Sequence, residues 1–133
     1  MEEISKNGVI LPRHITAEDI QSGMNFFSND NEFIQVGFSH HDESGKEIKP
    51  HIHNTVERKV SRTCEVLYVV KGALDVVVYD TDKIMVKKLT VKRGETLILL
   101  EGGHGFFIKE DDTVILEVKN GPYLGAEMDR HRI

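Results

Sequence analysis

The sequence has few of the residues that mark several classes of protein. Its 133 residues include one cysteine and no tryptophan, so no internal disulfide can form and a disulfide-rich secreted scaffold is excluded. No apolar run approaches the roughly 20 residues that span a bilayer, and no charged segment followed by an apolar one opens the chain. We therefore expect a cytoplasmic protein that does not insert into membranes.

Positive charge is also scarce. The 17 Lys and Arg residues are outnumbered by 22 Asp and Glu residues, which gives a formal net charge of −5. Binding to nucleic acid or to an anionic membrane surface would call for a basic patch, so we expect neither as a partner. With 39% hydrophobic and 29% charged residues, the composition is that of one globular domain.

Short apolar and alternating segments, separated by turn residues, run through most of the chain. Their spacing, with turns about every eight to twelve residues, is typical of an all-β sandwich or barrel. A jelly roll, or double-stranded β-helix, is the closed double-sheet form that best fits it. We predict a hairpin at Lys71-Gly72, and strands at 32–38, 46–53, 65–71, 73–79, 84–91, 96–100, 104–108 and 113–119.

Helical periodicity is nearly absent. Thr16 begins the one candidate, a capping-box-like start to a helix of about two turns that ends near Met24. We expect a frayed segment at 1–7 and a short strand at 8–11 that ends at Pro12. The predicted organisation is a single domain, with an N-terminal arm and short helix (1–28), a β-barrel (32–119) and a charged tail (120–133).

Histidines and one glutamate suggest the chemistry. His51 and His53 are two residues apart in a β-prone segment, so their imidazoles would share one face of a strand and could reach one ion. Glu65 opens an apolar strand in phase with Leu67 and Val69. A carboxylate that faces an apolar interior is costly unless a cation or a proton offsets it.

A third imidazole, His104, follows another apolar strand in the sequence LLEGGHGFFI. The glycines on both sides of it, Gly103 and Gly105, leave the backbone free to bend closely. Each feature alone is weak, because a His-x-His pair is more often a surface feature and a Gly-Gly-His-Gly run is most often a turn. Together they favour one shared metal site.

The order and spacing of these residues resemble the first motif of the cupin superfamily, Gly-x5-His-x-His-x3,4-Glu-x6-Gly. Gly45, His51, His53, Glu65 and Gly72 follow it, although eleven residues separate His53 from Glu65.

The second cupin motif, Gly-x5-Pro-x-Gly-x2-His-x3-Asn, is approximated from Gly94 to His104. Leu100 stands in place of the proline, the histidine comes one position early, and Ile108 stands in place of the asparagine. A looser likeness over residues 32–130 is similar to small bacterial cupin-fold metalloproteins, the WbuC-like proteins among them.

The resemblance implies a cupin barrel with one divalent metal ion, iron, manganese, nickel or zinc, held by His51, His53, Glu65 and His104. Glu57, four residues after His53, is the competing carboxylate ligand. In many double-stranded β-helix proteins an N-terminal strand lies across a partner subunit, so the resemblance also implies a homodimer.

An octahedral metal with four protein ligands would leave two positions for substrate or dioxygen. We expect a metal-dependent isomerase or epimerase that acts on a small polar substrate, either sugar-like or a carboxylate. The alternatives are a non-haem iron dioxygenase, a non-catalytic small-molecule binding or sensing protein, and a metal-free cupin with a structural role.

Further residues are candidates for contact with the substrate. Glu57 and Tyr68 are the nearest candidate catalytic bases by sequence. Arg58, in the basic loop 54–63, has a guanidinium suited to a carboxylate or phosphate of the substrate, and the alternative is a solvated basic loop. Tyr123 and Phe106 are the other candidate substrate contacts.

Overall fold

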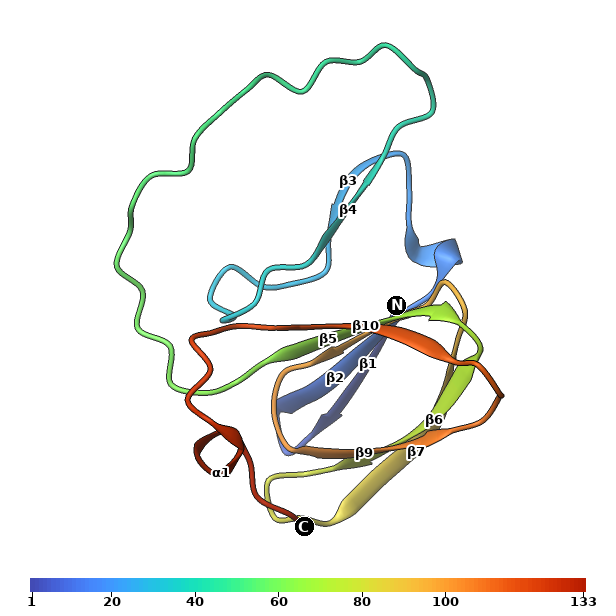
Figure 1. The fold of residues 1–133 in the computed structure, drawn as a ribbon, viewed down its shortest axis with the longest axis vertical. Coiled ribbons are helices and arrows are strands. Elements are labelled where there is room, and N and C mark those ends of the chain that lie inside the picture. Colours follow the sequence, from blue (N-terminus) through green and yellow to red (C-terminus); the bar gives the residue numbers. More distant parts are fainter.

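The computed structural model describes all 133 residues, and antiparallel strands make up most of its regular structure (Figure 1). The expected all-β class is confirmed. The elements in chain order are β1 (Glu2–Lys6), β2 (Val9–Ile15), the 3-10 turn η1 (Ala17–Asp19), β3 (Gly23–Phe26), β4 (Gly37–His40), β5 (Glu65–Lys71), β6 (Ala73–Tyr79), β7 (Met85–Lys92), β8 (Thr96–Leu99), β9 (Gly103–Ile108), β10 (Val114–Lys119) and α1 (Ala126–Asp129).

The strands form three antiparallel sheets. Five strands pair in the order β1-β2-β8-β5-β10, three pair in the order β7-β6-β9, and β3 pairs with β4. The six strands predicted from residue 65 onward are all present, from β5 to β10. The hairpin predicted at Lys71-Gly72 is wrong, because β5 and β6 belong to different sheets. Gly72, with φ of 78°, makes the sharp turn between them.

The main core lies between the five-stranded and the three-stranded sheets. Alternation along each strand turns every second side chain inward, and these inward residues are mostly leucine and valine. Burying such a side chain fully contributes about 1.5–3 kcal/mol, so this cluster supplies most of the apolar stabilisation. Its buried members are Ile4, Leu11, Leu67, Val69, Leu74, Val76, Val78, Val91, Leu97 and Leu99.

Strand β8 is apolar on both faces because it is covered on both sides. Leu97 and Leu99 face the main core, whereas Ile98 and Leu100, just past the strand end, join a second cluster on the outer face of the five-stranded sheet. Residues 27–38 cover this outer face, and the rings of Phe27 and Phe38 pack edge to face there at 5.9 Å. Each face of β8 therefore has its own apolar layer.

A buried arginine joins this covering segment to β2. The side chain of Arg13 is only 3% exposed, and its two terminal nitrogens donate to both carboxylate oxygens of Glu32 at 2.6 and 2.8 Å. Arg13 Nε donates to Glu3 at 2.9 Å, and Nη1 donates to the carbonyl oxygen of Phe27 at 3.2 Å. Burial raises the pKa of Glu32, but hydrogen bonds from Arg13 and Asn29 lower it more, so the net pKa lies below the ordinary value.

The N-terminal residues are ordered in a sheet, so the expectation of a frayed start at 1–7 is wrong. β1 pairs with β2 of the same chain. β2 also continues through Pro12 to Ile15, rather than ending at the proline. The register steps from Glu3 opposite Arg13 to Ser5 opposite Ile10, which leaves Pro12 at a bulge, where a strand tolerates a residue without an N–H.

The helix predicted from Thr16 to Met24 is also wrong beyond its first turn. The capping interaction is present, since Thr16 donates its backbone N–H to Asp19 Oδ2 at 2.8 Å. It caps only η1, because Gly23 adopts a φ of 93°, which no right-handed helix uses, and opens β3. The local signal was correct, but the length of the helix was not.

The largest departures concern the two strands predicted at 32–38 and 46–53. Only Gly37–His40 pairs, as β4, and the segment 46–53 has no regular structure. Residues 41–63, which we call the arm, are exposed throughout and form the open arc between β4 and β5 in Figure 1. A strand needs a partner for its backbone N–H and C=O groups, and the arm has none within the chain.

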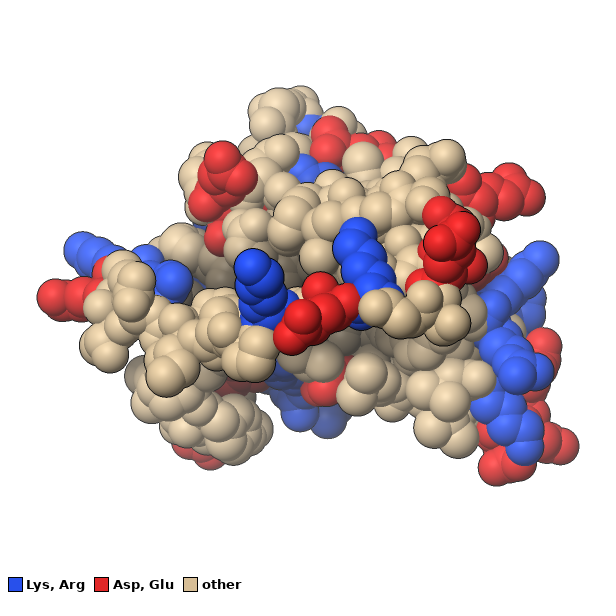
Figure 2. All heavy atoms as spheres, turned by 90° about the horizontal axis from the view of Figure 1, so that it is seen from above, with Lys and Arg blue, Asp and Glu red and all other residues tan.

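The surface carries charges of both signs. Figure 2 shows Lys and Arg side chains next to Asp and Glu side chains, with no extended area of one sign on that face. None of the helical elements has the length and apolar character that crossing a bilayer requires.

Candidate functional site

Two of the predicted metal ligands meet between the two main sheets. Glu65 points inward from the start of β5, in phase with Leu67 and Val69 of the main core. His104 lies opposite Val78 in the β6–β9 register, so it points to the same interior from the other sheet. His104 Nε2 and Glu65 Oε2 are 3.2 Å apart, with the two side chains 31% and 9% exposed.

Two charged residues of β10 complete this group. In the β5–β10 register Lys119 lies opposite Glu65 and Glu117 lies opposite Leu67, so both share the inward face. Lys119 Nζ is 3.7 Å from Glu65 Oε1 and 2.8 Å from Glu117 Oε1. Neither residue was among those expected at the site. The signal that could have revealed them is the position of opposite charges at the matching ends of two paired strands.

The charges in this group stabilise one another. Burial raises the pKa of Glu65, but the hydrogen bond from His104 and the positive charge of Lys119 are among the effects that lower it more, so the net pKa lies below the ordinary value. The hydrogen bond to Glu117 and the nearby carboxylate of Glu65 outweigh burial and raise the pKa of Lys119. At neutral pH, Glu65 is therefore a carboxylate and Lys119 an ammonium.

One wall of the group is aromatic. The ring of Phe106 stacks on His104 with 5.0 Å between centroids and 26° between planes. Phe106 and Ile108 follow His104 on the inward side of β9, but both remain exposed because no strand pairs with the outer edge of β9. The group thus lies at an open side of the sandwich, with charges at one end and apolar side chains beside them.

The other two predicted metal ligands lie elsewhere. His51 and His53 are exposed on the arm, with their rings 5.2 Å apart, and His51 Nδ1 is 3.0 Å from the carbonyl oxygen of Lys49. No group of three or more His, Cys, Asp or Glu side chains is placed to hold a metal ion. The four residues therefore do not form a metal site as this single chain arranges them, because the predicted strand 46–53 is not formed.

The remaining candidates are spread over the molecule. Glu57 and Arg58 are exposed on the arm, and Tyr123 is exposed in the tail. Tyr68 lies opposite Leu116 on the outer face of the five-stranded sheet, so it points away from Glu65. Among the proposed catalytic and substrate-binding residues, only Phe106 contacts the Glu65–His104 pair.

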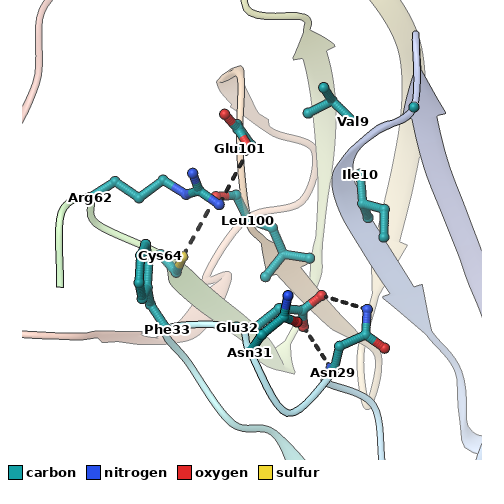
Figure 3. Close-up of a pocket in the computed structure, with 11 residues that line it drawn as sticks. Val9, Ile10, Asn29, Asn31, Glu32, Phe33, Arg62, Cys64, Leu100 and Glu101 are labelled. Atoms are coloured by element: carbon teal, nitrogen blue, oxygen red, sulfur yellow. Dashed lines mark hydrogen bonds and ion pairs between the residues drawn. The ribbon is translucent and has the colours of Figure 1, made fainter. Parts of the chain in front are cut away.

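A separate pocket of about 310 Å³ lies on the outer side of the five-stranded sheet (Figure 3). Arg62 Nη2 is 3.3 Å from Glu101 Oε2, and the guanidinium lies 5.1 Å from the centre of the Phe33 ring. Burial raises the pKa of the Cys64 thiol against the opposing effect of Arg62, so the sulfur is a poor nucleophile. The pocket is lined by Gly8, Val9, Ile10, Asn29, Asn31, Glu32, Phe33, Arg62, Cys64, Leu100 and Glu101.

Comparison with known proteins adds no family to this geometry. No family model, no curated protein and no solved structure matches the chain.

Proposed function

We propose that the Glu65–His104 pair is the centre of a site for a small polar molecule, and that it catalyses proton transfer of the isomerase or epimerase type. The observation that carries the proposal is the 3.2 Å contact between a nearly buried carboxylate and an imidazole that comes from the opposite sheet. We further propose that the two facing sheets form a jelly-roll barrel of the cupin type, with the Glu65–His104 pair at its open side.

The roles follow from the contacts. Because the Glu65 carboxylate is the partner of His104 Nε2, it favours the ring tautomer with its proton on Nε2 and leaves the lone pair on Nδ1. Nδ1 then removes a proton from a carbon next to a substrate carbonyl, and returns it to a different carbon or to the other face. Lys119 supplies a positive charge near the developing oxyanion, and Phe106 offers an apolar surface to the substrate.

The test is exchange of substrate hydrogen with solvent. The protein is incubated in D2O with a panel of aldoses, ketoses, their phosphates and 2-keto acids, and deuterium incorporation is followed by NMR. We expect incorporation into one class, with a loss of at least about 100-fold for His104→Ala, which is the lower range for general base catalysis. Arg62→Ala, which alters the separate pocket, is the matched control. Incorporation into no compound, or an unchanged rate in His104→Ala, would contradict the proposal.

A metal-dependent form of this function is the second candidate. It is favoured by the meeting of two of the four predicted ligands and by the proximity of His51 to His53 on the arm. The arm would have to bring both histidines to Glu65 and His104. Elemental analysis of the protein purified without added metal or chelator should find iron, manganese, nickel or zinc, and the His51→Ala/His53→Ala variant should lose it. Metal content that is absent, or unchanged in the variant, would contradict this form.

A further inference from the structure

The consecutive strands β9 and β10 each have an edge with no partner, as do β1 and β7 at the other ends of the same two sheets. β9 pairs only with β6, and β10 pairs only with β5. An open edge presents backbone N–H and C=O groups to any strand that can reach it. Both strands also expose large apolar side chains, and the most exposed is Phe107, at 71%. Phe107 lies opposite Asp75, so it points away from the main core, whereas Phe106 and Ile108 point toward the interior.

The arm has properties that complement this open edge, since it is extended, unpaired and carries exposed apolar side chains. Its 23 residues carry no regular structure and are all exposed. Four large apolar side chains stand on it, at Ile48, Ile52, Val56 and Val60, and Ile52 is 93% exposed. In an extended conformation Ile48 and Ile52 share one face, and His51 and His53 share the other. The arm is therefore a strand-like segment without a partner, in a chain whose strand β9 has an open edge.

The C-terminal end of the arm is fixed to the C-terminal part of the chain. At its C-terminal end, Asn120 Nδ2 donates to the carbonyl oxygen of Arg62 at 3.0 Å, and the N–H of Cys64 donates to Asn120 Oδ1 at 2.6 Å. Thr63 donates to Asp129 at 2.7 Å. The C-terminal tail continues from there to the first residue of β9, where Ile133 lies close to Gly103. Figure 1 shows the arm as an arc that leaves the body of the molecule.

We propose that residues 46–53 of the arm add as a strand to the free edge of β9 in a second copy of this chain, and that the two copies exchange arms reciprocally. Addition of a strand to an open edge is an established mode of association. Reciprocal exchange closes a two-fold dimer, because each chain carries both the strand and the edge.

The alternation of side chains sets the orientation of the added strand. Ile48 and Ile52 lie on the outward side beside Phe107, where three exposed apolar side chains cover one another. His51 and His53 then face inward, on the side of His104 and Phe106. The partner's arm thus contributes two imidazoles to the open side where Glu65 and His104 meet. The proposed dimer interface does not depend on the proposed catalytic function. Only the role of the two histidines rests on that function.

Cross-linking within the full chain distinguishes a second copy from the chain's own arm. The Ile52→Cys/Phe107→Cys variant is treated with a short bismaleimide, which bridges nearby positions without requiring one exact register. The natural Cys64 is buried and stays unreactive. We expect a covalent dimer. A cross-link within one chain, or none at all, would overturn the proposal. Ile52→Cys/Met85→Cys is the control, because Met85 is exposed on β7, at the opposite edge of the same sheet.

Sedimentation gives a second readout that needs no substrate or metal. The unmodified protein should have twice the 15.1 kDa mass of one chain. Ile48→Asp/Ile52→Asp should raise the dimer dissociation constant at least about tenfold, equivalent to about 1.4 kcal/mol. Met128→Asp, in the exposed tail, should not change it. A monomeric unmodified protein, or an unchanged constant in the double variant, would overturn the interface. If the unmodified protein is a dimer but incorporates no deuterium into any substrate, only the proposed function is contradicted.

Discussion

The two sides of the sandwich differ in what covers them. Around β8, apolar layers lie on both faces, and the one buried guanidinium nearby has two carboxylates and a carbonyl oxygen around it. At β9 and β10, the edges are unpaired, the aromatic side chains are exposed, and a charged group lies at the opening. The first side has the features of a stabilising core. The second side has the features of a binding surface. The proposed Glu65–His104 site and the proposed dimer interface both lie there.

The largest effect should come from the buried charge on the covered side. Arg13→Met keeps much of the side-chain volume but leaves Glu32 nearly buried without its counter-charge, which costs about 3–5 kcal/mol. The free energy of unfolding in urea measures it. Glu3→Gln changes the more exposed carboxylate around the same arginine and should cost less than about 1 kcal/mol. Equal losses in the two variants would show that the buried pair with Glu32 has no special weight.

Truncation of leucine on the two sides tests the comparison directly. Leu67→Ala removes a fully buried side chain of the main core and should cost about 2–5 kcal/mol. Leu116→Ala, on the neighbouring β10, removes a side chain that is half exposed and should change the stability of the monomer by no more than about 0.5 kcal/mol. Urea unfolding at low protein concentration compares them. Similar losses would mean that the β10 face is covered in solution.

Acid should weaken the covered side through Glu32. Its folded pKa lies below the ordinary value of 4.5, so its contribution is fully present above the unfolded pKa and is lost as pH falls through the folded pKa. Glu32→Gln should cost about 1.5–3 kcal/mol at neutral pH, as for a hydrogen bond to a charged group. The difference from the unmodified protein should shrink below about pH 4. Unfolding midpoints at pH 7 and pH 3 give the comparison, and a constant difference would contradict it.

The smallest effect concerns the charges on the open side. Lys119→Met removes a positive charge that lowers the pKa of Glu65, so that pKa should rise. The carboxyl carbon signal of Glu65, followed by NMR between pH 2 and pH 7, would report it. Lys109→Met removes an exposed lysine that contacts Asp75 on the other side of the three-stranded sheet and is the control. An unchanged Glu65 titration in Lys119→Met would show that Lys119 is too distant or too solvated to act.

Where the pattern of a segment decides its structure locally, prediction from the sequence succeeded. From residue 65 onward, strong apolar alternation and Gly or Asp turns specify each strand almost to its ends. The same alternation correctly turned Glu65 inward. The capping turn at Thr16 was also a local matter, because one side chain and one backbone N–H are enough to form it.

The other features of the structure depend on which strands pair with one another. The segment 46–53 has a strand-like sequence but no partner within the chain, so His51 and His53 stay on the arm. Lys119 lies against Glu65 only because β10 pairs with β5 in one particular register. The sequence by itself determined the all-β class, the strands from β5 to β10 and the inward direction of Glu65. Only the tertiary structure decided that Lys119 meets Glu65 and that His51 and His53 do not, because strand pairing joins residues that are distant along the chain and depends on the whole sheet.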